Sequence, residues 1–171
     1  MSRKEPPSRV VRVECKPDER LIRLLGVPRS RIRHENNKGV LCNRLRRQEN
    51  NIAVIDEDPA SAQPSYLRDV RVVEDSHGVR VLEDAQRGHR IIVLCPRLEG
   101  WILKVARRNG IRPEDYGLPP DEDGLHKKIN LRLQRFEDLI RGLLERKCPE
   151  LDDLRRWIRA EREGATGPRA L

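Results

Sequence analysis

The chain has 171 residues, of which 37% are charged and 36% hydrophobic, and its formal net charge is +8. This length suits one ordinary domain, and the clustering of apolar residues in blocks such as IAVI and RIIVLC indicates a folded core rather than disorder. The charge comes from 29 Arg and 7 Lys, which favours an anionic partner such as nucleic acid, although a charge-rich protein without one stays open. An aromatic content of 3% excludes a platform that stacks bases on exposed rings.

Strand and helix patterns alternate along the first part of the chain. Apolar blocks and turn residues predict strands over 9–15, 30–35 and 52–55 and helices over 16–26 and 40–49. Further along, they predict strands over 69–73, 78–84 and 89–96, a helix over 97–110, a loop over 111–124, and helices over 131–144 and 151–158. Alternating strands and helices are typical of βαβ units.

The predicted fold class is therefore α/β, with a mostly parallel sheet flanked by helices and a C-terminal helical extension. We expect an α/β domain over 9–110, a helical extension over 125–162 packed on it, and flexible tails over 1–8 and 163–171.

The four cysteines are far apart in sequence, at Cys15, Cys42, Cys95 and Cys148. No C-x-x-C occurs, so the pattern argues against a zinc site, and buried free thiols are expected. The sequence contains no signal-peptide pattern and no apolar run of membrane-spanning length. We therefore expect a cytoplasmic protein with no membrane association.

Acidic side chains follow two of the predicted strands. Glu14 ends the first strand, and Asp56, Glu57 and Asp58 follow IAVI directly. In an extended segment Asp56 and Asp58 point to one side and Glu57 to the other. Because ligands of parallel sheets bind beyond the carboxyl ends of the strands, these acids are expected to meet there. Carboxylate oxygens suit Mg²⁺ or Mn²⁺.

Structural roles for the same residues stay open. Glu14 could be an exposed strand-end residue, Asp58 before Pro59 has the pattern of a helix N-cap, and Asp18 suits a cap or the first turn of a helix. Glu99 is interpreted as a structural or surface residue. The histidines receive no role, and the acidic loop PPDEDG and the pair Lys127 and Lys128 are interpreted as solvated.

Two segments of the chain resemble motifs of the Toprim domain of topoisomerases, bacterial-type primases and overcoming-lysogenization-defect nucleases. VECKPDE (13–19) is similar to the V-E-G-K-x-D-E form of small Toprim proteins, and VIDEDP (54–59) is similar to the later Asp-x-Asp motif. The NNKG turn and, more loosely, CPRLEGWIL (95–103) also resemble family segments. The resemblance covers roughly 9–100, and it departs from the family in placing Cys15 where Gly is usual.

The resemblance implies a Toprim/Rossmann-like fold and a Mg²⁺-dependent protein that cleaves phosphodiester bonds in DNA or RNA. By the same resemblance Glu14 is the general acid/base or a metal contact, Asp56 and Asp58 bind Mg²⁺ (or Mn²⁺), and Asp18 is a neighbouring acid at the site. Many nucleases of the family act in phage defence beside an ATPase partner. An ATPase partner protein and a homodimer are thus open expectations for this chain.

Two other functions stay open. The domain could be a non-catalytic module that binds nucleic acid or a partner protein, with the helices near 130–160 as the docking element. The presence of Cys15 in place of Gly is consistent with this alternative. Another metal-dependent phosphotransfer enzyme, such as a phosphatase-like domain, would also carry Asp-x-Asp after a strand. There the motif would end the first strand, whereas here Glu14 comes earlier.

Overall fold

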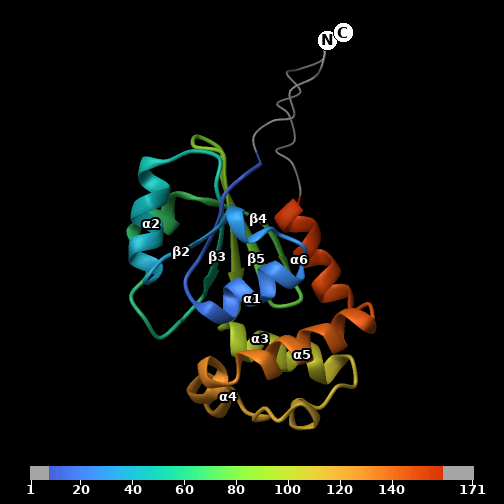
Figure 1. Ribbon diagram of the computed structural model, residues 1–171. Helices are drawn as coiled ribbons and strands as arrows, with labels where there is room; N and C mark the ends of the chain where they lie inside the picture. Colours follow the sequence, from blue (N-terminus) through green and yellow to red (C-terminus); the bar gives the residue numbers. More distant parts are fainter. Residues whose placement is uncertain (1–7, 160–171) are drawn as a thin grey trace, which may run out of the picture.

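The computed structural model describes residues 8–159, which build one six-stranded sheet with helices on both faces (Figure 1). The strands are β1 (Val11–Val13), β2 (Ile32–His34), β3 (Ile52–Asp56), β4 (Arg71–Ser76), β5 (Val79–Asp84) and β6 (His89–Leu94). Their order is β2-β1-β3-β6-β5-β4; the first four in this order run parallel, and β5 and β4 add an antiparallel edge. The predicted α/β class with a mostly parallel sheet is confirmed.

Most predicted helices are present with small shifts of their ends. They are α1 (Lys16–Leu24), α2 (Lys38–Arg47), α3 (Leu98–Arg108), α4 (Glu122–Lys128), α5 (Leu133–Glu145) and α6 (Pro149–Arg159). Short 3-10 turns are η1 (Arg29–Arg31), η2 (Ser65–Asp69), η3 (Pro113–Tyr116) and η4 (Ile129–Leu131). Within residues 8–159 no helix has both the length and the apolar character needed to cross a membrane.

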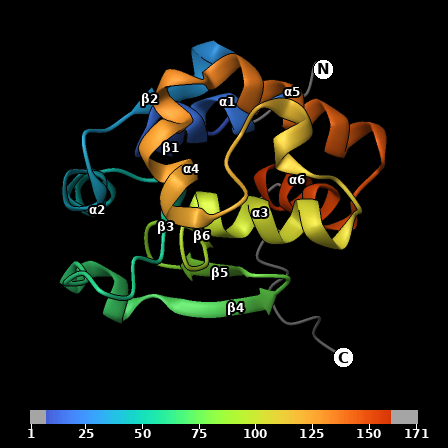
Figure 2. The ribbon, with the colours of Figure 1, turned by 90° about the horizontal axis from the view of Figure 1, so that it is seen from below.

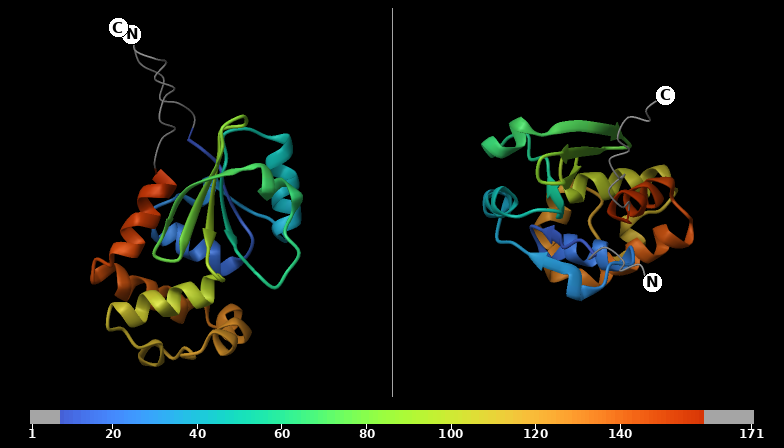
Figure 3. Two further views of the ribbon diagram at one scale, coloured as in Figure 1. Left: turned by 180° about the vertical axis from the view of Figure 1, so that it is seen from behind. Right: turned by 90° about the horizontal axis from the view of Figure 1, so that it is seen from above.

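The two faces of the sheet are covered by different helices, and β3 shows how its sequence serves both. Ile52 and Val54 pack into a core with α1, α3, α5 and α6, whereas Ala53 and Ile55 pack into a second core with α2 and η2. Side chains alternate between the faces of a strand, so a wholly apolar strand is required where both faces are buried. Figure 3 shows α2 on one side of the sheet and α3 and α6 on the other.

The C-terminal helices share the larger core with the sheet. Phe136, Leu143, Leu151 and Ile158 are buried in the same cluster as Val54 of β3. Figures 1 and 2 place α4 and α5 beside α3, at the end of the molecule where the parallel strands finish. The division into a domain over 9–110 and an extension over 125–162 stays a prediction. Apart from Ser8, the predicted tails lie outside the described residues.

The loop predicted over 111–124 is wrong at its end, because α4 begins at Glu122. Asp121 caps this helix: its side chain accepts a hydrogen bond from the Gly124 N–H at 2.7 Å. Leu125 is fully buried and anchors the helix against the core. The acidic run PPDEDG is thus largely a helix start, in which acids near the N-terminus are favourable.

Candidate functional site

Two carboxylates lie where neighbouring strands end. β1 and β3 pair in parallel with Val13 opposite Val54, so Glu14 and Asp56 leave the sheet at the same edge. The Glu14 carboxylate accepts a hydrogen bond from the Asp56 N–H at 2.8 Å, although the two residues are 42 positions apart. Val11 and Val13 face the α1 side of the sheet, and alternation therefore directs Glu14 to the α2 side.

On the α1 side, Asp56 adjoins two buried acids. Asp56 Oδ1 accepts the Leu98 N–H of α3 at 2.9 Å. Asp18 on α1 is 1% exposed, and neither of its carboxylate oxygens has a hydrogen-bond partner of ordinary geometry within residues 8–159. Glu99 on α3 is 6% exposed; one oxygen lies 3.0 Å from His126 Nδ1 of α4, and the other has no partner in the described part of the chain. Glu14, Asp18, Asp56 and Glu99 are called the acid cluster below.

Burial and mutual repulsion raise the pKa values of this cluster. Burial is the main cause for Asp56, followed by the negative charges of Asp18, Glu14 and Glu99, and the Leu98 N–H opposes part of the rise in its pKa. Burial also raises the pKa of Asp18, against a hydrogen bond from the Cys15 thiol. Both groups therefore ionise readily only when positive charge is supplied close by.

Glu14 lies between the buried acids and a more open region. Burial raises its pKa, while the Asp56 N–H and the charge of Lys38 act in the opposite direction. Lys38, at the start of α2, is 8% exposed. Its ammonium group donates to the Glu57 carbonyl at 2.9 Å and to Gln63 Oε1 at 3.2 Å, and so joins α2 to the segment after β3.

Asp58 does not cap a helix, so this interpretation is wrong. No helix begins at Pro59, and the backbone of Asp58 is left-handed, with a φ of 47°. Its N–H donates to the Pro96 carbonyl at 2.9 Å, and its carboxylate lies 4.0 Å from Lys38 Nζ. Since Asp58 is not extended, the argument that it shares a side with Asp56 does not apply; its charge acts on Glu14 instead.

Glu57 turns away from the acid cluster, as the sequence predicted. Its carboxylate forms an ion pair with Arg80 of β5 at 3.2 Å. Cys15, which replaces the glycine of the resembling motif, is the N-cap of α1 with a φ of −144°. This backbone conformation is extended and open to any residue, so the replacement causes no backbone strain. All four cysteines are free, and Cys42 and Cys148 are buried as expected.

A groove with a volume of about 540 Å³ lies between α2 and the segment 58–65; it is called the α2 groove below. Glu14 and Asp58 belong to its lining, so the groove reaches both of these site acids. The other lining residues come from the start and one face of α2 and from the segment itself. The groove therefore gives access to Glu14 from the side opposite to Asp18.

Sequence reasoning missed Glu99 and Lys38 as neighbours of the site. Glu99 follows β6, which pairs with β3, and this adjacency is the signal that could have suggested it. Lys38 stands in the NNKG turn, and no local pattern shows that its ammonium group reaches the segment after β3. Of the predicted site residues, the structure brings Glu14, Asp18 and Asp56 together and places Asp58 beside Glu14 and Lys38.

The donor chemistry of the acid cluster suits a hard cation. Carboxylate oxygens are the ligands that Mg²⁺ and Mn²⁺ prefer, and the carboxylates of Asp18 and Glu99 are buried beside Asp56. In residues 8–159, no group of three or more His, Cys, Asp or Glu side chains is arranged so that it could hold a metal ion as it stands.

Comparison with known proteins leaves the family of the chain open. No protein-family model, no curated protein and no solved structure matches it.

Proposed function

We propose that the protein is a Toprim-type nuclease that uses Mg²⁺ or Mn²⁺ to hydrolyse phosphodiester bonds in nucleic acid. The observation that carries the proposal is the meeting of Glu14 and Asp56 at one sheet edge, next to the carboxylate of Asp18, which is 1% exposed. These are the acids of the two motifs that resemble the Toprim domain. The net charge of +8 further supports a polyanionic substrate.

The acids differ in the roles that their surroundings support. Asp56 and Asp18, with Glu14 and Asp58 at the open side, would hold the metal ion, which when bound polarises a phosphate oxygen and activates water. Glu14 lines the α2 groove, so a substrate in the groove can reach it. Burial raises the pKa of Glu14, which suits a group that takes and returns a proton near neutral pH.

Hydrolysis adds a hydroxyl group to phosphorus and breaks the bond from phosphorus to one ester oxygen. The proton lost by the attacking water has to leave, and the departing oxygen has to gain one. In the proposed reaction Glu14 carries the proton. Asp56 positions Glu14, since its N–H donates to the Glu14 carboxylate at 2.8 Å.

The test compares cleavage of labelled single-stranded and duplex DNA and RNA by the wild-type protein and by Asp56→Asn, with Mg²⁺ or Mn²⁺ present. Asparagine keeps an oxygen that can accept the Leu98 N–H, so the fold is preserved while the charge is lost. We expect a loss of activity of at least about 100-fold. Glu57→Gln is the matched control and should cleave normally, because Glu57 is adjacent to Asp56 in the chain but pairs with Arg80 rather than with the cluster. Equal cleavage by wild type and Asp56→Asn, or none by either on every substrate, would refute the proposal.

A non-catalytic binding module is the second candidate. It is favoured by the hydrogen bonds of the acids, since Glu14 and Asp56 each accept a backbone N–H in the manner of structural caps. In that case binding of nucleic acid should depend strongly on salt and be unaffected by chelators. Asp56→Asn would then leave binding of nucleic acid unchanged.

A further inference from the structure

The α2 groove extends away from the acid cluster along one face of a helix. Gly39, Asn43 and Arg46 line it, and their spacing of three and four residues places them in one row on α2. Seven residues of helix span about 10 Å. This is room for roughly three nucleotides at the 3.4 Å rise per nucleotide of a strand in helical form. Glu14 and Asp58 belong to the same lining, so the row leads toward the site.

Arg46 supplies a fixed positive charge in this row. Its guanidinium donates to Ser65 Oγ at 2.6 Å and lies 5.8 Å from the ring centroid of Tyr66, so it is held between α2 and η2. A guanidinium has five N–H donors, and the Arg46 side chain is exposed, so donors remain for a phosphate.

The start of the row offers a neutral donor at close range. In the first turn of α2, the Val40 N–H is bonded to Asn37 Oδ1 and the Lys38 N–H to Glu14, which leaves the Gly39 N–H for a ligand. A Cβ at this position would meet only Asn37 Oδ1, at 3.2 Å, so its absence leaves the backbone open to the groove. Asn43 is exposed in the lining and adds an amide that can donate and accept.

The size and lining of the groove favour one strand over two. A volume of about 540 Å³ is that of a site for a small molecule, and it accommodates a short stretch of one strand but not a base-paired duplex. Tyr66 is 4% exposed and its hydroxyl is bonded to Asp84, so it offers no face on which a base could stack. Recognition would therefore come from phosphate and sugar contacts and tolerate different sequences.

We propose that the α2 groove binds single-stranded nucleic acid, with Arg46 and the Gly39 N–H at the start of α2 on different phosphates of one strand, and leads the strand to Glu14. This inference names the substrate class of the proposed nuclease and so rests on that function. It adds that a strand has to be unpaired to reach the acids, and that Arg46 is a binding residue about 10 Å from the helix start.

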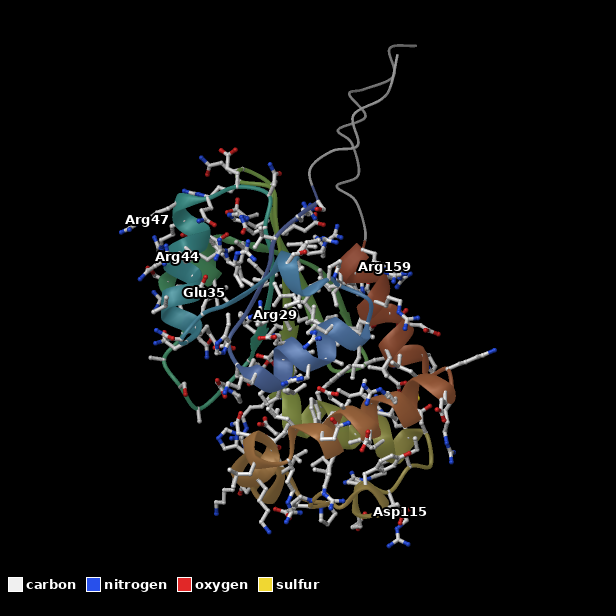
Figure 4. All side chains as sticks on the ribbon, viewed as in Figure 1. Arg29, Glu35, Arg44, Arg47, Asp115 and Arg159 are labelled. Carbon is white, nitrogen blue, oxygen red and sulfur yellow. The ribbon has the colours of Figure 1, made fainter. Side chains whose placement is uncertain are left out.

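The test measures binding of fluorescent oligothymidine and oligouridine strands, and of a DNA duplex of equal length, by anisotropy in buffer with EDTA. The variants are Arg46→Glu and Asn43→Asp in the groove, and Arg47→Glu as the matched control. Arg47 is exposed on the same helix, carries the same change of charge, is absent from the lining, and projects away from the sheet (Figure 4). Thermal unfolding confirms that each variant is folded.

The wild-type protein should bind single strands more tightly than the duplex. Arg46→Glu should weaken single-strand binding by at least about 10-fold, and Asn43→Asp by a smaller factor, while Arg47→Glu stays within about 3-fold. Loss of one phosphate contact should also reduce the slope of log affinity against log salt by about 0.7. The two single strands show whether DNA or RNA is preferred.

Equal effects of Arg46→Glu and Arg47→Glu, duplex binding as tight as single-strand binding, or no binding to any strand would overturn the inference. The metal-free assay separates it from the proposed catalysis. If binding depends on Arg46 but no cleavage occurs in Mg²⁺, the proposed nuclease activity is refuted and the α2 groove is supported as a binding site. If duplex and single strands are cleaved equally fast and Arg46→Glu does not change the rate, the nuclease activity is supported and the role of the α2 groove is refuted.

Discussion

Replacing Asp18 by Asn should change the pH dependence of stability, because the burial of this carboxylate opposes folding when it is ionised. Asp18 is 1% exposed, and burial raises its pKa to about 7. In the unfolded chain an aspartate has a pKa of about 3.9. The folded state therefore holds more protons than the unfolded state between these values, and stability falls as the pH rises through this window.

The size of the effect follows from the shift. Each pKa unit corresponds to about 1.36 kcal/mol, and between about pH 5 and pH 8 the ionisation of Asp18 would remove up to about 3 kcal/mol. Neighbouring acids share part of this shift, so we expect about 2 kcal/mol. For a chain of this size that amounts to about 4–8 °C in melting temperature.

The assay is thermal unfolding of the wild type and of Asp18→Asn at both pH values, in buffer with chelator. The melting temperature of Asp18→Asn relative to wild type should be about 4–8 °C more favourable at pH 8 than at pH 5. This comparison removes any constant penalty from burying the amide. Asp115→Asn, an exposed position on η3 (Figure 4), is the control and should show no such change. A difference that is the same at both pH values would refute the reasoning.

Three further predictions concern the scaffold. Glu35→Gln should lower the free energy of unfolding by about 3 kcal/mol in urea titrations, because Arg12 and Glu35 form an ion pair with side chains 9% exposed; a loss below about 1 kcal/mol would contradict this. Asn37→Ala should cost about 1 kcal/mol, since the Asn37 side chain accepts the Val40 N–H at the start of α2, and an unchanged urea midpoint would disprove the role. Leu143→Ala should cost about 2–5 kcal/mol and keep a single unfolding transition, because Leu143 is fully buried in the core shared with the sheet; separate transitions of α5 and the sheet would argue against one core.

The strands and most helices could be predicted because their sequence patterns are local. The apolar run of β3 is buried on both faces, and periodic leucines mark α5. The start of α4 was missed because prolines and acids were taken for a loop. The helix-cap role that the sequence left open for Asp58 is wrong because Asp-Pro fits a cap, while nothing local shows that the Asp58 backbone is left-handed.

The candidate site was predictable only in part. Glu14 and Asp56 could be grouped because the carboxyl ends of parallel strands meet at one edge of the sheet. The burial of Asp18 depends on how α1 packs against α3 and α5, and the α2 groove depends on the path of the segment after β3. These are tertiary relations between residues far apart in sequence, which no pattern within one segment contains.

Binding of Mn²⁺, followed by the loss of the free-ion signal in electron paramagnetic resonance, tests the central claim most directly. The wild-type protein should bind Mn²⁺ and release it to Mg²⁺, Asp56→Asn should bind at least about 10-fold more weakly, and Glu57→Gln should match the wild type. Because the raised pKa of Asp56 means that protons compete with the ion, binding should strengthen as the pH rises. Mn²⁺ binding that is absent, or equal in wild type and Asp56→Asn, would contradict a metal site at the acid cluster.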